Sequence, residues 1–221
     1  MSSADDLTTS ATSTSSELRA DIRRLGDLLG ETLVRQEGPE LLELVEKVRR
    51  LTREDGEAAA ELLRGIELET AAKLVRAFST YFHLANVTEQ VHRGRELRAR
   101  RAAEGGLLAR TADRLKDADP EHLRQSVANL NVRPVFTAHP TEAARRSILD
   151  KLRRVAALLD EPATAARERR LAEAIDLVWQ TDELRIDRPD PLDEARNGIY
   201  YLEGLGSTAV GDVLEELRDQ L

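Results

Sequence analysis

The stretch VRPVFTAHPTEAARR, residues 132–146, decides how the middle of the chain is predicted to fold. Its first half is rich in valine and phenylalanine, which favour β-strands. Pro140 then suits the first position of a helix, because that position needs no backbone N–H donor. The stretch therefore predicts one short strand at 132–138 that passes directly into a helix, with His139 at the junction.

This pattern places His139 at the carboxyl end of a strand, where barrel and open-sheet enzymes build their active sites. The positive end of the following helix disfavours an imidazolium. A neutral His139 is therefore suited to act as a general base near pH 7. The alternative is a histidine that only hydrogen-bonds to nearby backbone, and position alone leaves both interpretations open.

Three arginines near this junction form a candidate phosphate clamp. Arg145 and Arg146 are expected about two turns into the helix that begins at Pro140, and Arg185 follows Trp179 at the end of the next helical stretch. Each guanidinium offers a planar fork of donors that matches a phosphate. The alternative is that the three arginines pair with carboxylates on solvated helix faces.

Helices are predicted over most of the remaining chain. Hydrophobic residues (41%) are mostly Leu, Ala and Val, with 3% aromatic and 33% charged residues. This balance suits amphipathic helices, so the fold class is mainly α with a single strand. The spacing of apolar residues and the positions of Pro and Gly predict helices at about 16–35, 39–55, 67–104, 107–117 and 121–129. Two more helices are predicted from Pro140 to before Pro162 and from there to about residue 181. A last helix is predicted from Pro191 onward, with Asp190 as its cap.

Composition also excludes several functions. A net charge of −8 argues against nucleic acid or an anionic membrane as a partner. With no cysteine, the chain has no disulfide, thiolate ligand or cysteine nucleophile. No apolar run approaches the roughly 20 residues that span a bilayer, and the amino terminus resembles no targeting peptide, so we expect a cytoplasmic protein. His83, His92 and His122 are not spaced to share a metal and are expected in surface or core roles.

Three segments of the chain carry distinctive motifs. Residues 135–154 (VFTAHPTEAARRSILDKLRR) contain T-A-H-P-T followed by an arginine pair. Residues 76–93 (RAFSTYFHLANVTEQVHR) lie upstream on the predicted long helix, and residues 179–185 (WQTDELR) are followed by P-x-D-E-A-R. These segments resemble, respectively, the amino-terminal signature, the long upstream helix and the next signature of the phosphoenolpyruvate carboxylase family. The likeness runs from about residue 18 to the end.

The resemblance implies a mostly helical enzyme built on an eight-stranded (β/α)-type barrel, with its first strand near 132–138. It divides the chain into a disordered Ser/Thr-rich tail (1–16), an amino-terminal helical region (17–130), and the first strand and following helices of an incomplete catalytic barrel (131–221). The family's metal-binding carboxylates, catalytic lysine and substrate-binding arginines would lie beyond residue 221. The chain is therefore expected to be a fragment that is inactive alone, with apolar faces left exposed.

The resemblance also implies an activity. The family joins bicarbonate to phosphoenolpyruvate with Mg²⁺ or Mn²⁺ and without biotin, giving phosphate and oxaloacetate that feeds the tricarboxylic acid cycle. The residue matching His139 takes a proton from carboxyphosphate, and in plant members those matching Arg145, Arg146 and Arg185 help to bind an anionic activator. A homotetramer controlled by allosteric metabolites is implied as well. Competing interpretations are a free-standing helical interaction module and another phosphoenolpyruvate-using barrel enzyme, whose own motifs are not present.

Overall fold

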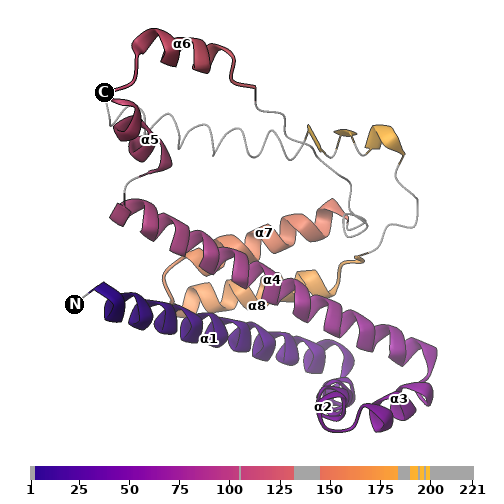
Figure 1. The fold of residues 1–221 in the computed structure, drawn as a ribbon. Coiled ribbons are helices and arrows are strands. Elements are labelled where there is room, and N and C mark those ends of the chain that lie inside the picture. The colour runs from indigo at the N-terminus through magenta and orange to yellow at the C-terminus, as the bar shows by residue number, and fades with distance from the viewer. Residues whose placement is uncertain are drawn as a thin grey trace. The chain divides into compact units, whose positions relative to one another are not determined.

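The computed structural model describes residues 3–104, 106–131, 145–183, 190–193, 195–196 and 198–199, with side chains except at 3–14, 104 and 107–109. These residues form helices and contain no strand (Figure 1). The helices are α1 (Ser3–Glu37), α2 (Pro39–Glu54), α3 (Gly56–Arg64), α4 (Leu68–Glu104), α5 (Leu107–Leu115), α6 (Pro120–Ala128), α7 (Arg146–Asp160) and α8 (Ala165–Trp179). The mainly helical fold class is confirmed for the described ranges. The predicted strand at 132–138 lies outside them, so the strand and the barrel stay predictions.

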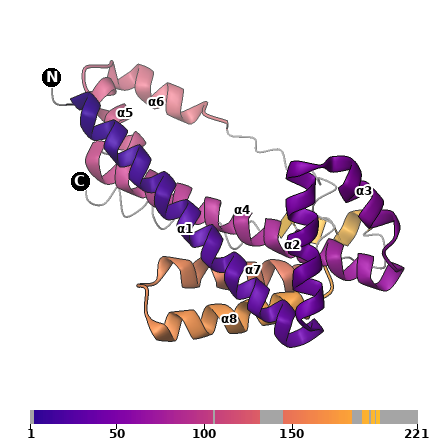
Figure 2. The same cartoon turned by 90° about the horizontal axis from the view of Figure 1, so that it is seen from below.

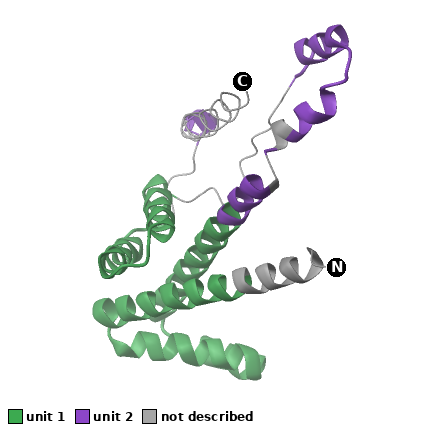
Figure 3. Ribbon diagram, turned by 90° about the vertical axis from the view of Figure 1, so that its left-hand side faces the viewer, with its two compact units in different colours: residues 1–94, 144–184 green, residues 95–143, 185–221 purple. Residues whose placement is uncertain are grey.

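The chain divides into two compact units (Figure 3). The first comprises residues 1–94 and 144–184, and the second comprises residues 95–143 and 185–221. The boundary at residue 94 falls within α4. The predicted domain boundaries at residues 16 and 130 are not tested by this division and stay predictions.

An aliphatic core holds the first unit together. Helix α1 packs against α2 and α8, and α7 packs against α8 as a helical hairpin (Figure 2). In α7, apolar residues recur at intervals of three or four, so one face is buried. Burying each large aliphatic side chain contributes about 1.5–3 kcal/mol. The buried core residues are Leu25, Leu29 and Leu33 of α1, Leu41 of α2, Ala77, Leu84 and Val87 of α4, Ile148, Leu152, Val155, Leu158 and Leu159 of α7, and Leu171, Ala174, Ile175, Val178 and Trp179 of α8.

Helix α1 begins at Ser3, well before the start that we predicted near residue 16. Residues 3–16 therefore have helical backbone where a disordered tail was expected. This segment contains neither proline nor glycine. Extending an existing helix costs far less free energy than nucleating one. The polar segment can therefore be helical because it continues the amphipathic part of α1. The predicted helix start was too late because the prediction considered only the lack of apolar side chains, and the disordered tail at 1–16 stays a prediction.

Helix α3 was not predicted, because Asp55 and Gly56 were interpreted only as a helix stop. In the structure Asp55 ends α2 and also caps α3. Its carboxylate accepts hydrogen bonds from the backbone N–H groups of Glu57 (3.1 Å) and Ala58 (3.0 Å). An aspartate between two helical stretches is thus a start signal as well as a stop signal.

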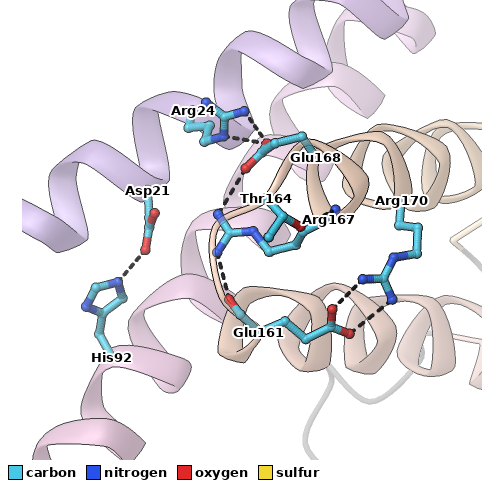
Figure 4. A network of polar contacts seen from close by, with 8 residues as sticks. All are labelled: Asp21, Arg24, His92, Glu161, Thr164, Arg167, Glu168 and Arg170. Carbon is cyan, nitrogen blue, oxygen red and sulfur yellow. Dashed lines mark hydrogen bonds and ion pairs between the residues drawn. The ribbon is translucent and has the colours of Figure 1, made fainter.

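A chain of ion pairs ties the connection between α7 and α8 to α1 (Figure 4). Arg24 Nε donates to Glu168 Oε2 at 2.6 Å, and Arg167 Nη2 donates to Glu168 Oε1 at 3.0 Å. Arg167 Nη1 also donates to the backbone carbonyl oxygen of Glu161 at 3.0 Å. Thr164 caps α8 by accepting from the Arg167 backbone N–H. Arg167 is therefore a buried cation that stabilises the hairpin connection by contacting both Glu161, directly after α7, and Glu168 of α8.

His92 of α4 is buried, which agrees with the expectation of a surface or core role. Its Nε2 lies 2.8 Å from Oδ2 of Asp21, so the pair links α4 to α1 within the first unit (Figure 4). Buried polar side chains are stable where they are paired in this way. The contact explains a histidine in a core position without invoking a metal.

In the second unit, α5 and α6 agree with the predicted ranges. Asp119 caps α6 by accepting from the His122 backbone N–H at 3.0 Å, behind a proline at the first helical position. Asp190 accepts from the Asp193 backbone N–H at 2.7 Å, so its predicted role as a cap is confirmed. Of the helices described, none combines the length and apolar character needed to cross a membrane.

Candidate functional site

Arg145 and Arg146 stand at the beginning of α7, not inside a helix. Arg145 is the N-cap residue, with an extended backbone (φ −65°, ψ 144°), and Arg146 is the first helical residue. An extended residue cannot lie within a continuous helix. The prediction that one helix runs from Pro140 and holds both arginines about two turns inside it is therefore wrong at Arg145. The two arginines instead flank the positive end of the α7 dipole.

Arg145 is tied to the segment that follows α8. Its backbone N–H donates to the backbone carbonyl oxygen of Glu183 at 3.1 Å. Its Nη1 lies 3.7 Å from Oδ2 of Asp182, whose side chain is 75% exposed. An ion pair at that distance and exposure is weak. Arg146 also takes part in an interaction within the protein. The backbone of Arg145 is thus fixed more firmly than its guanidinium.

Glu183 is held on its other side by α4. Ser79 Oγ donates to Glu183 Oε2 at 2.7 Å, and His83 Nε2 lies 2.5 Å from Glu183 Oε1. Partial burial acts to raise the pKa of Glu183, but the hydrogen bonds from His83 and Ser79 and the charges of His83 and Arg76 outweigh it and lower the pKa. Glu183 is therefore a carboxylate at neutral pH.

Trp179, the first residue of the WQTDELR block, packs beside this cluster at the end of α8. Its side chain is 2% exposed, and its indole N–H donates to Oε1 of Glu37 at 3.3 Å. The guanidinium carbon of Arg76 lies 5.0 Å from the ring centroid, a cation–π geometry. Lys73 Nζ contacts Oε2 of Glu37 at 3.1 Å. These contacts join α1, α4 and α8 at one place.

The arrangement has the chemistry to bind an anion. The start of a helix favours negative charge, and two adjacent guanidiniums supply directional donors. Asp182 already faces Arg145, so an incoming anion has to compete with that carboxylate. The alternative that the arginines pair with carboxylates is thus observed in part, for Arg145 and Asp182.

Two of the predicted site residues, His139 and Arg185, lie outside the described residues, so their roles stay predictions. Of the predicted clamp, the structure therefore describes Arg145 and Arg146 alone and places them side by side at one helix end. It does not test whether Arg185 joins them.

Sequence reasoning missed the cluster of Ser79, His83 and Glu183. His83 had been assigned only a surface or core role. A signal was present, because Ser79 and His83 are four residues apart and therefore share a face of the predicted long helix. What the sequence did not indicate is that Glu183 lies opposite that face.

A divalent metal is implied by the family resemblance, but the described residues do not supply a donor set for it. Within the described ranges, no group of three or more His, Asp or Glu side chains could hold a metal ion. Such ions need several oxygen ligands gathered at one point. The metal therefore has no part in the residue roles derived below.

The fold and the cluster define a mainly helical protein that gathers charged side chains from α4, the start of α7 and the end of α8. The family model for phosphoenolpyruvate carboxylase matches residues 18–221. The chain belongs to the phosphoenolpyruvate carboxylase family.

Curated relatives agree with this assignment. The chain is 38% identical to the phosphoenolpyruvate carboxylase of Alcanivorax borkumensis, over 92% of this chain and 26% of that protein. It is 36% identical to the enzyme of Bradyrhizobium diazoefficiens, over 92% of this chain and 24% of that protein. For the enzyme of Burkholderia mallei the identity is 39%, over 82% of this chain and 20% of that protein. The chain thus spans about a quarter of the length of these relatives or less.

Proposed function

We propose that the chain is the amino-terminal part of a phosphoenolpyruvate carboxylase, which converts phosphoenolpyruvate and bicarbonate to oxaloacetate and phosphate. The observation that carries the proposal is the family match over residues 18–221, which contains the T-A-H-P-T segment and the arginine pair. The whole protein would use Mg²⁺ or Mn²⁺ bound by residues outside this chain, and no biotin. Its product would replenish the tricarboxylic acid cycle in the cytoplasm.

His139 is the proposed catalytic base. Bicarbonate attacks the phosphoryl group, which gives carboxyphosphate and the enolate of pyruvate. His139 then takes the proton of carboxyphosphate, the C–O bond to phosphate breaks, and CO₂ and phosphate are released. The enolate carbon attacks CO₂ to form oxaloacetate. General-base catalysis of this kind contributes about 10²–10⁴ in rate.

Arg145 and Arg146, together with Arg185, are the proposed binding site for an anionic activator such as a sugar phosphate. The position of Arg145 and Arg146 at the start of α7 supports this proposal, because the helix dipole and the two guanidiniums attract the same charge. The weak pairing of Arg145 with Asp182 leaves a contact that a doubly charged phosphate can displace. A homotetramer and feedback by other metabolites belong to the same proposal.

The experiment is an assay of the complete protein that contains this chain, with phosphoenolpyruvate, bicarbonate and Mg²⁺ and with oxaloacetate measured directly. Oxaloacetate formation that depends on both substrates is the expected result. The 221-residue chain alone is expected to be inactive, because it spans only about a quarter of its relatives. A complete protein that forms no oxaloacetate under these conditions would overturn the proposal.

A further inference from the structure

Glu183 connects two helices through two different parts of one residue. Its carboxylate accepts from Ser79 and contacts His83, which lie one turn apart on α4. Its backbone carbonyl accepts from the backbone N–H of Arg145, immediately before α7. Helix α4 therefore fixes the backbone position of Arg145 through Glu183. It needs no direct hydrogen bond to Arg145 to do so.

Helix α4 holds Ser79 and His83 in fixed positions. Thr80 and Leu84, which follow Ser79 and His83 in the sequence, are buried at 5% and 1% exposure. A helix that is packed in this way beside Ser79 and His83 cannot rotate without opening the core. Ser79 and His83 therefore present fixed partners to Glu183, and hydrogen bonds to a charged carboxylate are stronger than those between neutral groups.

We propose that Glu183 is a positioning residue for anion binding by Arg145: it transmits the fixed position of α4 to the guanidinium that meets the anion. The chemical class of ligand is a phosphate or phosphate monoester. The inference rests on the proposed function, which assigns Arg145 to an anion site. Glu183 itself does not touch the ligand.

The neighbouring carboxylate, Asp182, has the opposite effect. It is exposed, and its Oδ2 lies 3.7 Å from Nη1 of Arg145. It therefore neutralises part of the positive charge that would attract an anion. If charge alone mattered, removing either carboxylate would tighten anion binding, because each repels the ligand. Loss of affinity on removing Glu183 therefore requires a positioning role, and Asp182 supplies the matched control one residue away.

The test is calorimetric titration of the full 221-residue chain with inorganic phosphate at low salt. Glu183→Ala is expected to weaken phosphate binding about tenfold or more, since it removes two hydrogen bonds to a charged group. Asp182→Ala is expected to tighten binding by about two- to fivefold, the range of an exposed ion pair.

Two further variants test the hydrogen bonds of Glu183. Ser79→Ala, which changes no charge, is expected to weaken binding. Glu183→Gln, which can still hydrogen-bond, is expected to recover most of the affinity. Unfolding midpoints show which variants are folded. If Glu183→Ala does not fold, the phosphate affinity of Ser79→Ala tests the positioning role instead.

The outcomes separate this inference from the proposed function. Wild-type chain that does not bind phosphate, or binds it equally well after Arg145→Ala, overturns the anion site and the positioning role with it. Binding that depends on Arg145 but becomes tighter in Glu183→Ala, or is unchanged in Ser79→Ala, overturns the positioning role alone and leaves the anion site standing.

Discussion

The guanidinium of Arg76 stacks on the indole of Trp179, with 5.0 Å between the guanidinium carbon and the ring centroid. The contact joins α4 to the last residue of α8. Trp179 also donates to Glu37 at the end of α1. One side chain thus holds three helices together, directly before the segment that carries Asp182 and Glu183.

Trp179→Ala should therefore destabilise the chain strongly. Removing a large buried aromatic side chain leaves a cavity and costs about 3–5 kcal/mol. Leu177→Ala, two residues earlier on an exposed position of α8, should change the free energy of unfolding by less than about 1 kcal/mol. Urea unfolding followed by circular dichroism compares the two. Equal losses in both variants would show that Trp179 is not a core residue.

The second prediction concerns two arginines of α8 that both contact Glu161. Arg167 is 7% exposed and donates to the Glu161 carbonyl and to Glu168, so Arg167→Ala should cost about 2–4 kcal/mol. Arg170 pairs with the Glu161 carboxylate in a more exposed position, so Arg170→Ala should cost about 0–1 kcal/mol. Urea midpoints measure both. The structure would be contradicted if Arg170→Ala proved the more damaging change.

The third prediction is a pH dependence that arises from Glu183. Because its pKa in the folded protein is lowered from the ordinary value of 4.5, the carboxylate stabilises the fold above that value. The contribution is lost as the pH falls through the lower folded-state pKa. The stability difference between wild type and Glu183→Ala should therefore shrink as the pH falls from about 5 towards 3.

Leu177→Ala provides the control for this titration, since it removes no titrating group and its effect should not follow the same curve. Unfolding by urea at several pH values gives the free energies. A difference for Glu183→Ala that remains undiminished at pH 3 would contradict the lowered pKa.

The fourth prediction concerns an apolar stripe on α4, defined as Leu68, Val75 and Phe82. These residues are seven apart, so they share a helix face, and all three are exposed. An exposed apolar patch favours association. The isolated chain should therefore self-associate at high concentration, and Val75→Ser/Phe82→Ser should reduce this in sedimentation velocity without lowering helix content. Association that is unchanged in the double variant would place the contact elsewhere.

Apart from α3 and the starts of α1 and α7, the helix positions in the first unit were predictable because their apolar residues repeat at helical spacing. Pro39 and Gly38 marked the start of α2, and α4 differs from its predicted range by one residue at its start. The start of α1 was not predictable in the same way, because helix extension into residues 3–16 depends on the absence of breakers and not on apolar pattern.

The candidate site was predictable only in part. Arg145 and Arg146 were singled out by their pairing in the sequence, but their place at a helix start depends on the extended backbone of Arg145, which no residue pattern indicated. Ser79, His83 and Glu183 meet through tertiary contacts between distant segments. Local spacing cannot reveal such contacts, because it describes one helix at a time.

The most direct test of the account is His139→Asn in the complete carboxylase, with oxaloacetate and phosphate measured separately. The account predicts that oxaloacetate formation falls about 10²–10⁴-fold, the usual contribution of a general base, while phosphate release from phosphoenolpyruvate continues. Oxaloacetate formed at the wild-type rate would contradict the assignment of His139 as the base.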